Sequence, residues 1–193
     1  MAIKAPMKGC VKMSDEEIVR RIQDGDSQAF HELYDNYFDF AYRAAKVVMN
    51  SQQSYAKDAV QETFIRVYQH IHLFDCNRTF KPWFYKILLN ECNRILKKNS
   101  GVLSVGMDIN HSVQQNEQTN DKLNHFVEYE NLYKAIQHLD ENNRIPIILK
   151  YLSGFKEQEI AEILGENINT IKSRLFYGRK KLKHFLHCNE EGS

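Results

Sequence analysis

The chain of 193 residues carries 26 lysines and arginines against 25 acids, so its formal net charge is only +1. Its 42% hydrophobic and 26% charged residues are typical of a globular protein, and its three prolines and eight glycines leave room for long helices. Because no apolar stretch approaches the roughly 20 residues of a membrane helix and the start lacks the apolar run of a signal peptide, we expect a cytoplasmic protein without membrane insertion.

The chain begins with a tail, residues 1–13, that has no clear hydrophobic period and is predicted to be disordered. Helical patterning starts at Ser14, because Ser14 and Glu17 have the spacing of a capping box. Asp26 is the expected N-cap of a second helix. Apolar residues in that helix recur three and four positions apart, which predicts one buried stripe of Phe30, Leu33, Tyr37, Ala41 and Ala44.

A third helix is predicted over residues 54–71. Its expected buried stripe consists of Ala56, Val60, Phe64, Val67 and Ile71. The opposite side is polar but carries an apolar residue, Ile65, in its middle, which indicates a surface for a protein partner. The residues of this side are Asp58, Gln61, Glu62, Ile65, Arg66 and Gln69.

A fourth helix is predicted from about Pro82 to Lys98, and it combines aromatic and basic residues. One side of this helix carries Trp83, Lys86, Asn90, Asn93 and Lys97 at spacings of three and four. Rings and cations along one stripe can hold an unpaired nucleic-acid strand, with bases on the rings and phosphates on the lysines. The alternative is that Trp83 belongs to the core and the lysines form a solvated edge.

The next segment, residues 99–126, is rich in Asn, Gln and Ser and lacks a helical period, so it is predicted to be a flexible linker. Helical patterning resumes over residues 127–187 and leaves a short tail, 188–193. The predicted fold is therefore all-α, with two small helical domains, 14–98 and 127–187, joined by the linker.

The second domain contains a helix-turn-helix pattern in the stretch EQEIAEILGENINTIKSRLFYGRKKL. Gly165 suits the positive φ angle of the turn, and Asn167 is the expected N-cap of the second helix. One apolar stripe of that helix must pack against the rest of the domain. The stripe consists of Ile168, Ile171, Leu175, Gly178, Leu182 and Phe185.

The charge of the chain is strongly polarised despite its nearly neutral total. Residues 14–40 hold eight acids and two bases, whereas residues 167–189 hold six bases and no acid. Asn169, Ser173 and Lys180 lie opposite the apolar stripe, and short polar side chains followed by cations suit a helix that enters a DNA major groove. The alternative is a two-helix hairpin with a solvated basic face.

Neither metal ligands nor a catalytic constellation can be recognised. The four cysteines, Cys10, Cys76, Cys92 and Cys188, are scattered and have no histidine at zinc-ligand spacing, so they are expected to be reduced thiols. The histidines have no nucleophile or acid at catalytic spacing, and a glycine-rich phosphate loop is lacking. We therefore expect no metal, no cofactor and no enzymatic activity.

Four stretches, in their order and separation, resemble those of bacterial RNA polymerase sigma factors of the small extracytoplasmic-function type. They are GDSQAFHELYDNY, DAVQETFIRVYQ, FKPWFYKILLN and LDENNRIPIILKYLSGFKEQEIAEILGENINTIKSRLFYGRKKL. The resemblance covers residues 14–98 and about 128–186. It implies a promoter-specificity subunit that binds core RNA polymerase, recognises the −10 and −35 promoter elements and helps to open the DNA. An anti-sigma factor is a further partner that the resemblance implies.

The resemblance also implies roles for individual residues. The −35 element would be read by Asn169, Thr170, Lys172, Ser173, Arg174, Phe176, Tyr177, Arg179 and Lys180. The −10 element would be read by Trp83, Lys86, Asn90, Asn93, Arg94 and Lys97. Core polymerase would be bound by Asp58, Gln61, Glu62, Ile65, Arg66 and Gln69.

The chain departs from the pattern of this family in three respects. An Ala-Arg pair is common after the residue that matches Ile87, where this chain has Leu88 and Leu89. Arg94 stands where an Asp is common, and Glu166 follows the turn glycine where an apolar residue is usual. The first two bear on −10 recognition, and the third bears on the turn.

Two other functions are consistent with parts of the pattern. A stand-alone regulator would use only the helix-turn-helix and bind palindromic operators as a dimer without polymerase. A helical enzyme or an adaptor protein would carry the basic face incidentally. The aromatic and basic stripe of the first domain argues against the regulator, and the lack of a residue cluster for catalysis argues against the enzyme.

Overall fold

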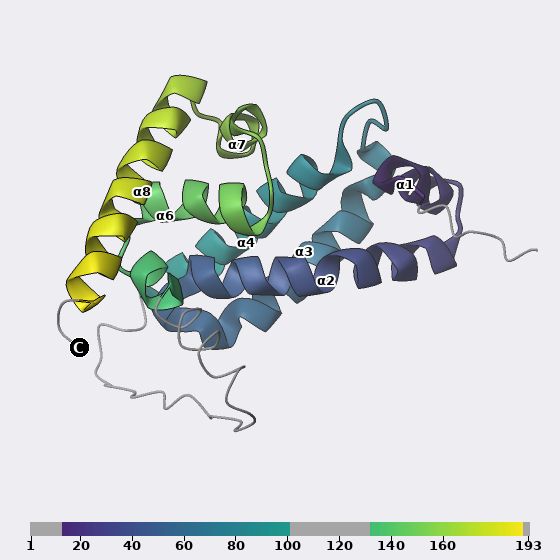
Figure 1. The fold of residues 1–193 in the computed structure, drawn as a ribbon. Coiled ribbons are helices and arrows are strands. Elements are labelled where there is room, and N and C mark those ends of the chain that lie inside the picture. The colour runs from purple at the N-terminus through teal and green to yellow at the C-terminus, as the bar shows by residue number, and fades with distance from the viewer. Residues whose placement is uncertain (1–12, 101–131, 191–193) are drawn as a thin grey trace, which may run out of the picture.

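The computed structural model describes residues 13–100 and 132–190, and every regular element within these ranges is helical (Figure 1). The predicted N-terminal tail up to residue 12, most of the predicted linker and the last three residues lie outside the described ranges. The all-α prediction is confirmed. The helices form two groups, one before and one after the segment that is not described.

The first group consists of four α-helices and two 3-10 turns. They are α1 (Asp15–Gln23), α2 (Ser27–Met49), η1 (Asn50–Tyr55), α3 (Ala56–His70), η2 (Ile71–Leu73) and α4 (Phe80–Ser100). The predicted caps are confirmed. Ser14 and Glu17 form the capping box of α1, and the Asp26 carboxylate accepts hydrogen bonds from the first turn of α2.

The helix α4 begins at Phe80, two residues before the predicted start, and ends at Ser100, two residues after the predicted end. The early start is stabilised by a hydrogen bond from the Phe80 N–H to the Glu16 carboxylate of α1 at 3.1 Å. Sequence periodicity cannot reveal this contact, because Glu16 belongs to another helix. Pro82 fits within the first turn, since its missing N–H would have had no partner within the helix.

Aromatic rings fill the space where α2, α3 and α4 cross. Phe84 of α4 packs against Phe64 of α3 with ring centroids 5.3 Å apart, and against Tyr37 of α2 at 4.7 Å. Phe80 and Phe84 are fully buried. The predicted inward stripe of α3 is confirmed as well, because its five residues are all buried. These large, rigid side chains fix the three helices relative to one another.

The second group begins with a helical segment at residues 132–137 and continues with four elements. They are α6 (Glu141–Ile147), a π-helical turn η3 (Ile148–Leu152), α7 (Glu157–Leu164) and α8 (Ile168–Glu190). The predicted helix-turn-helix is confirmed as α7 and α8. Gly165 has a φ angle of 67° at the C-cap of α7, and the Asn167 side chain accepts a hydrogen bond from the Asn169 N–H at 2.8 Å.

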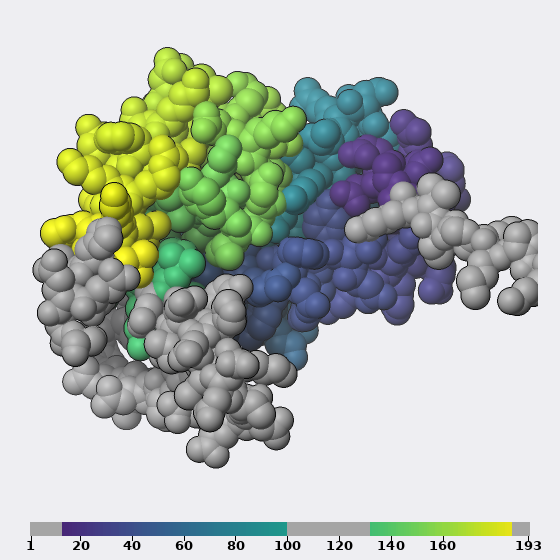
Figure 2. Space-filling view, in the orientation of Figure 1, coloured from purple at the N-terminus to yellow at the C-terminus, as the bar shows by residue number. Residues whose placement is uncertain are grey.

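The two groups of helices are in contact, chiefly through α4 and α7 (Figure 1). The Tyr85 ring of α4 packs edge-on against Phe155, with centroids 4.9 Å apart, and both side chains are buried. Lys81 lies 4.8 Å above the same Phe155 ring and donates a hydrogen bond to the Ser153 carbonyl at 2.6 Å. In Figure 2 the green atoms of the second group accordingly lie directly against the teal and blue atoms of the first.

The stripe of α8 packs on α6, and the closest approach is at Gly178. A Cβ atom at this position would lie 2.9 Å from Cγ1 of Ile147, which is buried. A contact this short requires Ile147 to move within a filled core. The glycine is therefore explained by the distance between the two helices, and the backbone conformation of α8 does not require it.

We predict that Gly178→Ala lowers the free energy of unfolding by about 1–2 kcal/mol, because overpacking against Ile147 outweighs the gain in helix propensity of roughly 1 kcal/mol. Urea titration followed by circular dichroism measures the effect. Ser173→Ala, at an exposed position of the same helix, is the control and should change stability by less than about 0.5 kcal/mol. A stabilised Gly178→Ala variant would show that the close approach is unimportant.

Candidate nucleic-acid and protein interfaces

An apolar groove with a polar rim runs between α2 and α3. It has a volume of about 820 Å³, and the predicted partner residues Asp58, Gln61, Glu62, Ile65 and Gln69 all line it. Ile65 is 50% exposed, which is unusual for an isoleucine in the middle of a helix. The predicted face of α3 is thus one continuous surface beside a groove that can receive apolar side chains.

Apart from the buried Phe64, three aromatic residues line this groove, and none of them was predicted as a site residue. Phe30 and Tyr34 come from α2, and Tyr68 of α3 is 64% exposed. Phe30 was expected in the buried stripe of α2, but it is only half-buried and packs edge-on against Tyr68 with centroids 5.1 Å apart. The packing of α2 on α3 leaves the outer edge of that stripe uncovered, and α2 periodicity alone gives no signal for this.

The sixth predicted residue of this face, Arg66, belongs to a charge cluster between α3 and α4. Arg66 forms an ion pair with Glu91, whose side chain is only 5% exposed. Arg94 binds the other oxygen of Glu91 at 2.6 Å and lies 3.5 Å from the Glu62 carboxylate. The Glu91 carboxylate raises the pKa of the Arg94 guanidinium, so Arg94 is charged at any physiological pH.

The predicted stripe of α4 is exposed for most of its length. Lys86, Asn90 and Lys97 are exposed, whereas Trp83 and Asn93 are half-buried. Arg94, with 45% of its side chain exposed, lies at the edge of the stripe nearest to α3. The helix therefore presents two cations with two amides between them along one side, a pattern that can bind a phosphate backbone.

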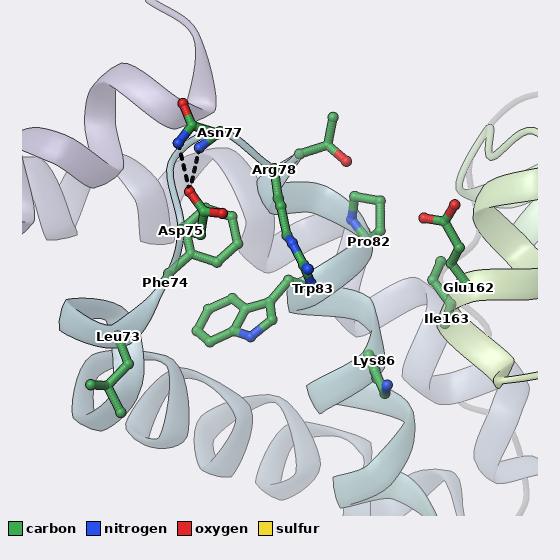
Figure 3. A pocket seen from close by; sticks show the side chains of 11 residues that line it. Leu73, Phe74, Asp75, Asn77, Arg78, Pro82, Trp83, Lys86, Glu162 and Ile163 are labelled. Carbon is green, nitrogen blue, oxygen red and sulfur yellow. Dashed lines mark hydrogen bonds between the residues drawn. The ribbon is translucent and has the colours of Figure 1, made fainter.

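Trp83 lies at the junction between the core and a pocket of about 890 Å³ (Figure 3). Its indole packs against Phe74 and Phe80, with centroids 5.0 and 5.6 Å away, and its remaining surface lines the pocket. The indole is therefore both part of the aromatic packing and accessible to a ligand. Lys86 and Arg78 supply positive charge to the same pocket.

The loop before α4 forms one wall of this pocket and was not predicted as part of a site. The Asp75 carboxylate accepts hydrogen bonds from the backbone and side-chain amides of Asn77 at 3.0 and 2.9 Å, as the dashed lines in Figure 3 show. These bonds lower the pKa of Asp75. The sequence Asp-Cys-Asn is a recognisable Asx-turn signal, but only the fold places this turn beside Trp83.

The opposite wall of the pocket comes from the second group of helices. Glu162 and Ile163 of α7 line it, and Figure 3 shows Glu162 across the pocket from Arg78 and Lys86. Because Glu162 is exposed, its carboxylate adds negative charge at the rim. The pocket thus combines aromatic surface, two cations and one acid.

The predicted reading face of α8 is largely exposed. Asn169, Lys172, Ser173, Phe176, Tyr177, Arg179 and Lys180 are all exposed in the second helix of the helix-turn-helix. Phe176 and Tyr177 pack edge-on against each other with centroids 5.4 Å apart. The N-terminal end of the α8 dipole adds positive potential to this face.

Two of the nine predicted α8 residues lie to the side of this face. Thr170 and Arg174, one helical turn apart, are only partly exposed. The Arg174 guanidinium forms a 3.0 Å ion pair with Glu166, the residue after the turn glycine. Glu166, which stands where an apolar residue was expected, therefore supplies a carboxylate that holds Arg174 beside the turn.

Groups of three or more histidine, cysteine or acidic residues that could hold a metal do not occur in residues 13–100 and 132–190. Burial raises the pKa of the Cys92 thiol to about 12, which keeps it protonated and unreactive. In the same two ranges, the helices are too short or too polar to cross a bilayer.

Comparison with known proteins matches both groups of helices. The profile described as sigma-70 region 2 matches residues 33–101, and the profile described as sigma-70 region 4 matches residues 129–182. The two ranges together cover more than half of the chain, and they contain the α3 and α4 surfaces and the helix-turn-helix.

Similar proteins extend over nearly the whole chain. The ECF RNA polymerase sigma factor SigW of Bacillus subtilis is 29% identical, with 90% of this chain and 97% of the relative covered. The ECF RNA polymerase sigma-E factor of Escherichia coli is 28% identical, with 89% and 93% covered.

A solved structure shows the same arrangement of helices. The sigma factor RpoE of Bartonella quintana, in complex with the anti-sigma factor NepR, is 25% identical and has a TM-score of 0.64. The match covers 81% of this chain and 97% of that structure. The order of the two regions, the relatives and this fold agree with one another. The chain belongs to the sigma-70 family of RNA polymerase sigma factors, in its extracytoplasmic-function group.

Proposed function

We propose that the chain directs core RNA polymerase to promoters through three separate surfaces. The groove between α2 and α3 binds core polymerase, the α4 stripe and its pocket bind the −10 element, and α8 binds the −35 element. The observation that carries this proposal is that one chain presents two separate exposed faces of amide and basic side chains, on α4 and on α8, beside an apolar groove suited to protein binding. The role requires no bond chemistry from the chain.

The docking surface combines the features expected of a protein interface. Its centre is apolar, with Ile65 and Tyr68 exposed beside the groove, and its rim carries Asp58 and Glu62. Aromatic and aliphatic anchors surrounded by polar residues are typical of such surfaces. We therefore assign this face to polymerase and the basic faces to DNA.

The −10 surface suits an opened strand better than a closed duplex. A flipped base can stack on the accessible part of Trp83, while Lys86, Asn90 and Lys97 follow the backbone. Unstacking one base costs roughly a few kcal/mol. Contacts of this kind, which exist only after opening, offset that cost and favour the melted state.

The −35 surface suits the major groove of a duplex. The start of α8 presents Asn169 and Ser173, which can bind base edges, and Lys172 and Lys180 can bind phosphates on either side. The stand-alone regulator is not favoured, because a helix-turn-helix acting alone has no use for the docking groove or the α4 stripe. As a polymerase subunit the chain would act in the cytoplasm.

A third partner is suggested by the relatives. The Bartonella quintana protein was solved with the anti-sigma factor NepR. We infer that this chain likewise takes an inhibitory protein partner. Such a partner would compete with polymerase for the docking groove, because an exposed apolar groove is the surface on which both could gain the most from burial.

Run-off transcription tests the proposed function directly. Purified core polymerase is supplied with a pool of genomic templates, with and without the chain, and the 5′ ends of the transcripts are sequenced. We expect initiation to concentrate at a small set of sites only when the chain is present. Initiation that is equally unselective with and without the chain would refute the proposal.

We predict that Glu62→Lys weakens binding to core polymerase by about tenfold or more, because it reverses a charge at the rim of the groove. The affinity is measured by fluorescence anisotropy of the labelled chain. Asp39→Lys makes the same charge change at an exposed position of α2, outside the groove, and should leave the affinity within about twofold. Equal affinities of the two variants would contradict the assignment of the docking face.

We predict that Lys172→Ala combined with Lys180→Ala weakens promoter binding by the holoenzyme and lowers the slope of log affinity against log salt by about two. Each lost phosphate contact removes roughly 0.9 from this slope. Lys181→Ala is the matched control on the same helix, because Lys181 binds Asp140, the N-cap residue of α6, at 2.5 Å, away from the reading face. An unchanged slope for the double variant would rule out the α8 assignment.

A further inference from the structure

Glu91 is a buried acid of α4 that none of the three proposed surfaces uses. The residue is 4% exposed, and its two carboxylate oxygens bind different helices: one binds Arg66 of α3 and the other binds Arg94 of α4 itself. A buried carboxylate is costly unless it is paired and hydrogen-bonded. The pairing with two guanidiniums satisfies this condition and ties both arginines to one fixed point.

The two arginines that Glu91 binds lie at the edges of two of the proposed surfaces. Arg66 adjoins the docking face of α3, and Arg94 lies at the edge of the α4 stripe. Both side chains remain more than 40% exposed, although Glu91 is buried. Each guanidinium is therefore held at its inner side by Glu91 while its outer side faces solvent.

Arg94 keeps donors available for a second anion. A guanidinium has five N–H groups in a rigid plane. The Nε–H of Arg94 donates to Glu91 at 2.6 Å, and Nη2 lies 3.5 Å from Glu62, which is a long contact between exposed groups. The terminal nitrogens therefore retain N–H groups that can bind a phosphate while Nε stays on Glu91.

We propose that Glu91 is a positioning residue for promoter contact: it fixes the Arg94 guanidinium at the edge of the α4 stripe so that its outer N–H groups bind a backbone phosphate of the −10 strand. This inference rests on the proposed function and deepens it. Fixing a flexible side chain in advance lowers the entropy cost of binding. Arg94 thus contributes through its bound geometry as well as its charge.

The contact between Arg94 and Glu62 links the Glu91–Arg94 pair to the docking face, because Glu62 lines the groove. Exposed ion pairs contribute little and exchange easily. When polymerase engages Glu62, Arg94 loses its weaker acidic partner and keeps the stronger one, Glu91. Docking thereby removes a carboxylate that competes with the DNA phosphate for the same guanidinium.

The test is a double-mutant cycle in the holoenzyme on an initiating promoter, read as the lifetime of the open complex after a heparin challenge. Arg94→Ala should shorten the lifetime by about tenfold, as expected for one lost charge-assisted hydrogen bond. Glu91→Gln should shorten it by a similar factor. The double variant should be no more than about twofold worse than Glu91→Gln, because an Arg94 that is not fixed contributes little.

Arg94→Lys provides a second arm that leaves the buried acid in place. A lysine keeps the charge, but a single ammonium lacks the planar fork that reaches Glu91 and a phosphate together. We expect Arg94→Lys to lose most of the lifetime that Arg94→Ala loses. Arg20→Lys makes the same change at an exposed position of α1, outside the proposed surfaces, and is the control that should stay within about twofold of the wild type.

The outcomes separate this inference from the proposed function. If the wild-type holoenzyme forms no open complex, the proposed function fails and the cycle has no starting point. If the wild type opens promoters but Glu91→Gln is neutral, the effects of the two substitutions are additive, or Arg94→Lys equals the wild type, the positioning role is overturned. Should Glu91→Gln unfold, as thermal melting would show, the Arg94→Lys arm decides alone.

Discussion

A chain of contacting aromatic rings determines where the surfaces of the first helical group lie. The chain begins at the docking groove, crosses the interface of α2, α3 and α4, and ends at the pocket beside α4. Its members are Phe30, Phe64, Phe84, Phe80, Trp83 and Phe74, with successive centroids between 5.0 and 6.4 Å apart. Rings in such contact allow little sliding between helices. The groove and the pocket are therefore two ends of one rigid packing, which places the proposed docking surface at a fixed distance from the proposed −10 surface.

The polar side of the same interface complements the rings. Glu91 binds one arginine from each of α3 and α4, so the two helices are joined by charge where their faces meet solvent. The family's common Asp at position 94 is replaced by Arg94 in this chain, and the acid one turn earlier, Glu91, accepts both guanidiniums. The arginine at position 94 is thus explained by its place in a cluster of three residues, Arg66, Glu91 and Arg94. In this cluster the carboxylate is buried and the two cations are largely exposed.

Periodicity and capping chemistry predicted the parts of the fold that depend on neighbouring residues. The capping box at Ser14, the N-cap at Asp26 and the turn at Gly165 follow local rules, and the structure confirms each. Features that depend on how helices cross were not predictable in this way. The groove needs Phe30 and Tyr68 from different helices, and the pocket needs a loop and α7 beside Trp83. Tyr85 is buried because Phe155, 70 positions later in the numbering, covers it.

The packing of α7 on α4 bears on how a strand could enter the pocket. A phosphate near Trp83 would meet the cations Arg78 and Lys86, but also the carboxylate of Glu162 on the facing helix. Like charges at such a rim repel, and the repulsion weakens with salt. The contact between the groups is itself partly polar, since Lys81 binds the Ser153 carbonyl as well as the Phe155 ring. A polar contact of this kind exchanges for water at modest cost. On the side of α4 that faces α7, a bound strand would be attracted by the positive charges of Arg78 and Lys86. Packing of the second helical group brings the negative charge of Glu162 to the same pocket, and this charge opposes strand binding.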